Sequence, residues 1–445
     1  MGSWPDSRVI GAVLGLIAVL AIAATAWIYG VGTANYGGLP IRGDGSGYYV
    51  YLPAALLAHD LTMSRTAARS FGGSPESIPG VRFARTSVPL GYPGQHAYLD
   101  QYGVGEAVLI APFFAVGYAL AVVGNAPRDG YSWPFQAAAS AAGLVYMLIG
   151  LALLAALLRR WFSLRTVVVS LLALTFGAAV FEYGTNDATM SHAYSFFAIA
   201  LVLHLTLRVW ERPAPGGAVA LGVALGLVGL IRMTNLTVVL FCLLFGVERR
   251  SDLKSRARTL LRRYGLVLAG VAAFLVVLSP QLAYWHRITG EWVTDPYRGA
   301  GEHLELLHPH LIGVLFSVRK GLFFWTPLLV LAVIGLPFLR RTARPLFVPA
   351  VVYLPVAIWV VSSWTIWWYG GSFGMRALID EAPVFALGLA ALVETVRGVV
   401  GRRVLMGAVA LTTLLAVHGM LAYWVHAVPN DQTSLHRYLE SFRSL

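Results

Sequence analysis

Residues 9–29 have the sequence "VIGAVLGLIAVLAIAATAWIY", an apolar run of about 20 residues without a charged side chain. A run of this length can cross a hydrocarbon core of about 30 Å as an α-helix. A cleaved signal peptide has a shorter apolar region and a small-residue cleavage site, so we interpret the run as a retained span. Of the 445 residues, 58% are hydrophobic and only 12% are charged. The sequence therefore predicts an all-α polytopic membrane protein.

The formal net charge of +12 comes from basic residues that form short clusters between apolar runs. This pattern is typical of cytoplasmic loops that face anionic lipid, and it argues against a nucleic-acid partner. The single cysteine, Cys242, lies inside an apolar run, which excludes disulfides and cysteine metal clusters. We find no internal repeat and no low-complexity segment. Residues 1–445 are therefore expected to form one integral membrane domain without a separate soluble domain.

The basic clusters also predict the topology, because cytoplasmic loops carry an excess of lysine and arginine. Placing all the clusters inside gives about 11 spans, with the N-terminus cytoplasmic and the C-terminus outside. The clusters lie at 159–165, 208–212, 248–263, 340–344 and 397–403. The predicted spans are 9–29, 134–158, 165–182, 193–210, 216–231, 234–247, 265–285, 320–338, 346–364, 381–397 and 404–424.

In this topology the apolar segment 105–124 is not a full span, because Pro112 interrupts it and because it would move the cluster at 159–165 to the wrong side. We expect it to be interfacial or re-entrant, like residues 48–58. Nearly all the long irregular loops then face outside. They are predicted at about 30–133, 182–192, 286–317 and 367–380, and loops of this length are more often functional than accidental.

The first outer loop carries Asp44 in the stretch "GGLPIRGDGSGYYVYLPAALLAHDL", residues 37–61. Gly-Asp-Gly favours a turn whatever the function. Asp44 also lies beside Arg42 at the outer end of the first span, where a carboxylate can accept a proton from a substrate hydroxyl. Both interpretations remain open from the residues alone.

Four further polar residues on the outer side have a structural and a functional interpretation. Asp60 is best explained as a cap or an interfacial charge, and its neighbour His59 is a candidate phosphate contact. Asp187 and His192, in "EYGTNDATMSHAYSFF", precede a span. They fit an N-terminal helix cap and a substrate contact at the positive end of the helix equally well.

The basic residues on the outer side indicate a functional site more strongly than these four polar residues do. Arg319 and Lys320, in "LFSVRKGLFFWTPL", and Arg376, in "WWYGGSFGMRALID", lie on the outer side, where basic residues are not expected. Arg232 lies at a break between two short spans, where an ionisable group costs about 2.5 to 3.5 kcal/mol. One snorkelling arginine needs no function, but several cations around one cavity indicate a phosphate or pyrophosphate ligand.

Aromatic residues and histidines accompany these cations. Trp368 and Tyr369 belong to a tryptophan-rich run that is typical of an interfacial belt, and their rings can also stack on sugars. Gly370 and the glycine after it allow close approach of a chain. The three histidines of "EHLELLHPH" match no established metal-site spacing, so no metal is predicted.

Together these stretches resemble the GT-C superfamily of polyprenyl-phosphate-dependent glycosyltransferases. The resemblance is to the bacterial protein O-mannosyltransferase, aminoarabinose transferase and pilin arabinosyltransferase types, and it covers most of the chain. It rests on the order and sidedness of several segments: "RGDGSGYYVYLPAALLAHDL", "NDATMSHAYSFF", "GLIRMTN", "SPQLAYWHRITGEW", "SVRKGLFFWTPL" and "WYGGSFGMR".

The resemblance implies a GT-C fold with juxtamembrane helices in the first outer loop, and an inverting transfer of a sugar from polyprenyl phosphate to an acceptor hydroxyl. It implies Asp44 as the base, Arg319, Lys320 and Arg376 as phosphate ligands, and a wall built with Tyr48 and Tyr49. Asp44 stands without the paired Asp-Glu of the protein mannosyltransferases, which argues against peptide mannosylation.

The expected partners are a polyprenyl-phosphate-linked sugar donor, a protein or glycan acceptor and membrane lipid. The expected location is the bacterial inner membrane, with the active site on the periplasmic or extracellular face, and no cofactor is expected. Arabinose and mannose both fit as the sugar. An O-antigen ligase or polymerase with pyrophosphate-linked donors, or a transporter, is the alternative. A transporter predicts repeated halves and charges at the bilayer midplane, which the sequence lacks.

Overall fold

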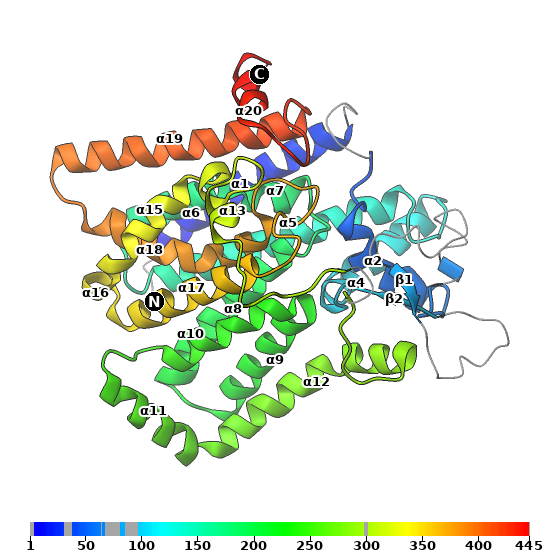
Figure 1. Ribbon diagram of the computed structural model, residues 1–445, viewed down its shortest axis with the longest axis horizontal. Coiled ribbons are helices and arrows are strands. Elements are labelled where there is room, and N and C mark those ends of the chain that lie inside the picture. The colour runs from blue at the N-terminus through cyan, green and yellow to red at the C-terminus, as the bar shows by residue number, and fades with distance from the viewer. Residues whose placement is uncertain are drawn as a thin grey trace.

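The protein is described here by a computed structural model that covers residues 4–30, 38–63, 65–66, 81–84, 97–297 and 301–444. Helices dominate these residues (Figure 1). Among the described residues, seven helices are long and apolar enough to cross a membrane. Three shorter apolar helices, Leu164–Gly177, Pro215–Ile231 and Met233–Leu244, also coincide with predicted spans. The prediction of a helical membrane protein is confirmed, and the count of about 11 spans stays a prediction.

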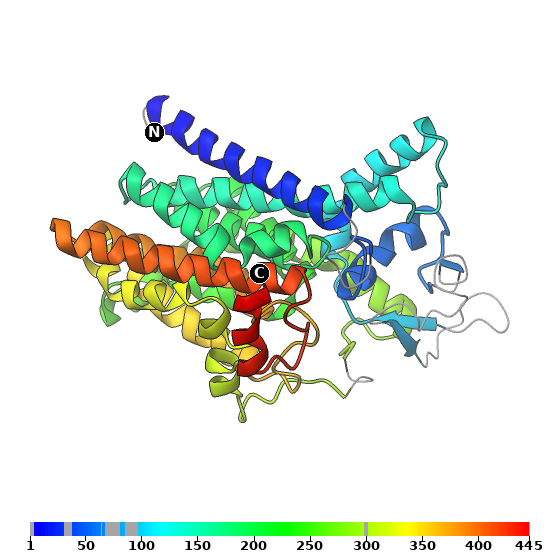
Figure 2. The same ribbon diagram turned by 90° about the horizontal axis from the view of Figure 1, so that it is seen from above.

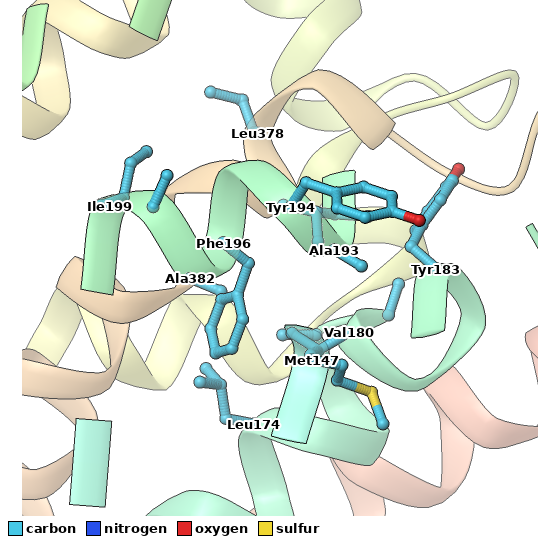
Figure 3. Packing of buried hydrophobic residues seen from close by; sticks show 14 of the residues in the cluster. Met147, Leu174, Val180, Tyr183, Ala193, Tyr194, Phe196, Ile199, Leu378 and Ala382 are labelled. Atoms are coloured by element: carbon cyan, nitrogen blue, oxygen red, sulfur yellow. The ribbon is translucent and has the colours of Figure 1, made fainter. Parts of the chain in front are cut away.

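The N-terminal half of the bundle consists of α1 (Trp4–Gly30), α5 (Trp133–Leu158), α6 (Leu164–Gly177), α7 (Val180–Thr185) and α8 (His192–Glu211). Figure 3 shows side chains of α5, α6, α7 and α8 gathered in one core, among them Met147, Leu174, Val180 and Phe196. Gly150 lets α5 approach α8 closely, because a Cβ at this position would lie 2.7 Å from the Phe196 ring. Small residues at helix contacts are typical of membrane bundles.

The C-terminal half contains two groups of helices. The first comprises α9 (Pro215–Ile231), η2 (Met233–Val238), α10 (Val239–Leu244), α11 (Arg250–Arg262) and α12 (Tyr264–Thr289). The second comprises α13 (Leu311–Phe316), α14 (Leu322–Trp325), α15 (Leu328–Gly335), η4 (Leu336–Phe338), α16 (Leu339–Thr342), η5 (Arg344–Leu346), α17 (Phe347–Ser362), η6 (Arg376–Glu381), α18 (Ala382–Thr395), α19 (Val399–Trp424) and α20 (Leu435–Ser444). The predicted span 320–338 is not one continuous helix, because the chain leaves helical geometry between Trp325 and Leu328.

Smaller elements gather at one end of the bundle. Helix α2 (Asp44–Leu56), helix α4 (Gly105–Val123) and the antiparallel strands β1 (Val81–Ala84) and β2 (Ala97–Asp100) lie there in both views (Figures 1 and 2). Val81 pairs with Asp100 and Ala84 with Ala97. The predicted first outer loop, about 30–133, supplies all four elements, and its residues 31–37, 64, 67–80 and 85–96 lie outside the described residues.

The sequence predicted that Pro112 interrupts the segment 105–124 and that this segment is interfacial or re-entrant. Pro112 does not interrupt the segment, because α4 is continuous for 19 residues. A proline removes only one backbone donor, which a helix can tolerate. The helix packs along the start of α5, where Gly117 lies beside Phe135, whereas α8 packs further along α5 at Gly150. Helix α4 is itself one of the seven helices long and apolar enough to cross a membrane, so its length does not bear out the expectation that it is not a full span, and the interfacial or re-entrant position stays a prediction.

We expect the contact between α9 and α12 to depend on Gly222. A Cβ at this position would lie 2.0 Å from the carbonyl oxygen of Gly270, and backbone cannot move as easily as a flexible side chain. Gly222→Val should reduce stability by about 1 to 3 kcal/mol, seen as a lower melting temperature in detergent. Gly265→Val, at a position on α12 with no neighbour within 4 Å, is the control. Equal melting temperatures for the two variants would contradict this account.

Candidate active site

A cavity of about 560 Å³ lies where α2, the ends of α8 and α9, α12 and two long loops meet. Its wall is mostly apolar and aromatic, with a few ionisable side chains. Gly103 brings the segment before α4 against the end of α9, because a Cβ there would lie 2.1 Å from the carbonyl oxygen of Leu230. The lining residues that carry charge or aromatic rings are Asp44, Tyr48, Tyr102, His192, Arg232, Trp285, Asp295, Tyr297, Glu302, Trp364, Tyr369 and Arg376.

Asp44 is the first residue of α2 and forms an ion pair with Arg376, with 2.6 Å between Oδ2 and Nη2. The flanking glycines are required locally. Gly43 has a φ of 51°, and a Cβ on Gly45 would lie 2.3 Å from the Thr189 side chain. The sequence Gly-Asp-Gly thus starts a helix against the loop that leads into α8.

The charge on Asp44 is set by opposing effects. Burial raises the pKa of its carboxyl group, and the neighbouring Arg376 together with a hydrogen bond from Tyr102 lowers it, so that the pKa lies below its ordinary value. Asp44 is therefore a carboxylate at neutral pH. Tyr102 also packs on Tyr48, with ring centroids 4.4 Å apart, so the wall around this carboxylate is aromatic.

A second charged cluster surrounds Asp380, which is completely buried at the end of η6. Its Oδ1 lies 2.8 Å from Nδ1 of His192, and its Oδ2 accepts a hydrogen bond of 2.7 Å from Asn235. Arg232 approaches the same carboxylate, with 3.8 Å between Nε and Oδ2. The cluster connects α8, the junction of α9 with η2, and η6 at the wall of the cavity.

Arg232 lies between α9 and η2 in an extended conformation, at the predicted break. Its guanidinium group is 6.0 Å from the ring centroid of Tyr369 and 3.4 Å from Nδ1 of His192. Because Nδ1 is already engaged with Asp380, the terminal nitrogens of Arg232, a residue of the cavity wall, retain N–H donors for a ligand. Arg376, by contrast, already shares one terminal nitrogen with Asp44.

Arg319 and Lys320 do not line this cavity. Arg319 forms two hydrogen bonds of 2.8 Å with Asp431, and its guanidinium group lies 4.0 Å from the ring centroid of Trp368. Lys320 is 2% exposed and donates to the backbone oxygens of Ser372 and Asn430. These two predicted phosphate ligands instead hold the loop before Arg376 against the chain beyond α19.

The remaining predicted contact residues also lie outside the cavity wall. Asp187 is buried and pairs with Arg42 at 2.9 Å. The hydroxyl of Tyr49 donates to the carbonyl oxygen of Gly130. Asp60 accepts from the backbone N–H of Thr62, as the capping interpretation expects. His59 is an exposed residue with a φ of 50°, and Trp368 lies against Arg319. Of the predicted contacts, Tyr48, His192 and Tyr369 line the cavity.

Three residues of this site were not predicted from the sequence: Asp380, Asn235 and Tyr102. A signal for Asp380 was present, since "RALIDEAP" puts two acids at the start of an apolar run, where ionisable groups are costly. Asn235 lies three residues after Arg232 in "RMTN" and carries no charge to mark it. Within the part of the chain that the structure describes, no three His, Cys, Asp or Glu side chains gather as a metal site, and the ring of His303 lies 3.2 Å from the carboxylate of Glu305.

No protein-family model and no curated protein matches the sequence. The archaeal oligosaccharyltransferase AglB from Archaeoglobus fulgidus, a GT-C family member solved with an inhibitory peptide and a dolichol-phosphate, is similar in structure. The TM-score is 0.50 at 11% identity, over 97% of this chain and 57% of AglB. Two further structures of the oligosaccharyltransferase from that organism also match. The structure with Zn and sulfate has a TM-score of 0.45 at 13% identity, over 93% of this chain and 53% of its own. The apo structure has a TM-score of 0.49 at 12% identity, over 97% of this chain and 57% of its own.

The likeness to AglB shows a shared fold, and this chain spans little more than half the length of that protein. The expectation of a GT-C type of fold is therefore supported by structure.

We expect Lys320 to make stability depend on pH. Burial, together with Arg376 and Arg319, lowers the pKa of its amine from 10.5 to about 7. Above pH 7 the unfolded chain therefore binds more protons than the folded chain, so this contribution to stability rises with pH. The melting temperature of wild type minus that of Lys320→Met should increase between pH 7 and 9. The same comparison for Lys254→Met, at an exposed position on α11, should be flat, and two flat comparisons would contradict the prediction.

Proposed function

We propose that this protein is a membrane glycosyltransferase that moves a sugar from a polyprenyl-phosphate donor to an acceptor hydroxyl by inverting displacement. The observation that carries the proposal is one cavity in which the carboxylate of Asp44 and the guanidinium groups of Arg232 and Arg376 converge. A lipid phosphate and a hydroxyl nucleophile need these two kinds of group at one place. The fold shared with AglB, whose structure contains a dolichol-phosphate, is consistent with a lipid-linked donor.

Arg232 and Arg376 are the residues that we assign to the donor phosphate. A guanidinium group carries five N–H donors, so Arg376 can bind Asp44 with one nitrogen and a phosphate oxygen with another. Arg232 presents its terminal nitrogens beside Tyr369. Fixed positive charge at this place stabilises the phosphate as it departs with more negative charge. Arg319 and Lys320 support this site indirectly, through the loop that carries Arg376.

Asp44 is the residue that we assign to the base. Its carboxylate is ionised and held by Arg376 and Tyr102, so it can receive the proton of the acceptor hydroxyl as the new glycosidic bond forms. The sugar–phosphate bond breaks in the same displacement, and the lipid phosphate leaves. A donor phosphate bound nearby adds negative charge, which raises the proton affinity of Asp44 at the moment of reaction.

The aromatic wall fits the sugar. Tyr48, Tyr297, Trp364 and Tyr369 line the cavity, and Tyr297 packs edge-on against Trp364 with ring centroids 5.0 Å apart. Aromatic faces bind the C–H faces of sugars, and arabinose and mannose remain the proposed sugars. The acceptor would be a protein or a glycan that enters from the open side of the cavity.

The proposed location is the bacterial inner membrane, with the cavity at the outer face and the N-terminus inside. The arrangement of charge supports this proposal. The basic helix α11 and the cavity helix α2 lie towards opposite ends of the molecule (Figure 1), and basic segments favour the cytoplasmic side.

The function is tested with purified protein and a panel of radiolabelled polyprenyl-phosphate sugars. Wild type should transfer at least one of them, and Asp44→Asn should lower turnover by about 10²-fold or more, because an amide cannot accept the proton. Donor affinity should change little, since the amide oxygen of the variant can still accept from Arg376 and Arg232 is unaltered. Asp60→Asn, at a carboxylate outside the cavity, is the matched control. Transfer by Asp44→Asn within a few-fold of wild type would remove Asp44 from the base role.

The orientation is tested with single cysteines in a Cys242→Ala background. His303→Cys lies at an exposed position on the loop that borders the cavity, and Arg258→Cys at an exposed position on α11. A membrane-impermeant thiol reagent added to intact cells freed of outer membrane should label the first and not the second. Permeabilised cells should show labelling of both. The reverse pattern in intact cells would place the cavity in the cytoplasm and exclude a periplasmic reaction.

A further inference from the structure

His192 has one ring nitrogen whose role is fixed by the protein. Nδ1 lies 2.8 Å from Oδ1 of Asp380, which is fully buried. The other carboxylate oxygen of Asp380 accepts from Asn235, so this group acts only as an acceptor. Nδ1 therefore carries the proton and donates it to Asp380. In the neutral ring this leaves Nε2 as a hydrogen-bond acceptor.

Nε2 is the nitrogen that a ligand can reach. His192 borders the cavity, and Nε2 has no hydrogen-bond partner among the described residues. His192 is 2% exposed and contributes to the cavity wall. The ring is held edge-on against Tyr183, with centroids 4.7 Å apart, and cannot swing to find another partner without disturbing this contact.

The surroundings determine which ligand group suits this acceptor. Arg232 and Arg376 supply the positive charge of the cavity, and the carboxylate of Asp44 is already bound to Arg376. The phosphodiester of a sugar-linked donor has no proton to give to Nε2, whereas a sugar hydroxyl does. Because Arg232 lies 3.4 Å from the same imidazole, a phosphate bound to Arg232 would hold its sugar beside His192.

We propose that Nε2 of His192 accepts a hydrogen bond from a hydroxyl of the donor sugar and thereby selects the sugar. The inference rests on the proposed function and adds a specificity-determining residue to it. A site built to pair with a ligand hydroxyl discriminates against the ligand that lacks it, since its own polar atom is left unpaired. A donor deoxygenated at that one position is therefore a poor ligand.

The test measures binding, and it separates the sugar from the lipid phosphate. Polyprenyl phosphate and its arabinosyl and mannosyl esters are titrated against purified wild type, His192→Leu, His192→Gln and Arg232→Gln. His192→Leu should weaken binding of the preferred ester about tenfold and leave polyprenyl phosphate unchanged. His192→Gln, whose amide oxygen can replace Nε2, should recover part of the loss. Arg232→Gln should weaken all three ligands.

His204→Leu is the matched control, because His204 belongs to the same helix α8 and does not line the cavity. It should bind every ligand as wild type does. Equal loss of ester and polyprenyl phosphate in His192→Leu would mean a structural role and would overturn the inference, as would unchanged binding of both esters. If wild type binds none of the three ligands, the proposed function fails and the inference fails with it. Binding without a sugar-specific loss refutes the inference alone.

Discussion

The ion pair between Asp44 and Arg376 is the interaction on which the rest of the site depends. It joins the first turn of α2 to the start of η6, two segments from opposite ends of the sequence. Both side chains are mostly buried, and a buried charge that loses its partner is strongly destabilising. The pair therefore fixes the position of the loop that carries Tyr369 and Arg376 relative to the helix that carries Tyr48. The cavity is the space that this link leaves between the two segments.

In the cluster around Asp380, a buried carboxylate is likewise compensated by its partners. Asp380 has no accessible surface and is satisfied by His192 and Asn235, while Arg232 supplies the compensating charge. Two carboxylates thus each hold an arginine at the cavity wall. Asp44 is partly exposed and available for chemistry, whereas Asp380 is enclosed and orients its neighbours. On this difference in burial we base the proposal of separate roles for the two acids, proton transfer for Asp44 and arrangement of the ligand-binding groups for Asp380.

The sequence predicted the helices that have long apolar runs, and it predicted Asp44, Tyr48, His192, Arg232, Tyr369 and Arg376 as candidates that the structure brings to one cavity. Unpaired charge beside an apolar run is a strong signal because it is costly. A charged residue beside an apolar run in the sequence does not reveal which partner compensates its charge. Arg319 and Lys320 carry the same signal, yet they bind Asp431 and two backbone oxygens. Asn235 is neutral and became visible only through its contact with Asp380. Pro112 likewise did not show where a helix ends, because α4 tolerates the loss of one backbone donor.

The central claim is that Arg232 and Arg376 hold the phosphate of a polyprenyl-linked donor in the cavity beside Asp44. An experimental structure of the protein with polyprenyl phosphate in a lipid nanodisc tests this claim most directly. The account predicts phosphate density within hydrogen-bond distance of Arg232 or Arg376, with the lipid chain leaving towards the bilayer. Phosphate density bound to Arg319 and Lys320, with the cavity beside Asp44 empty, would contradict it.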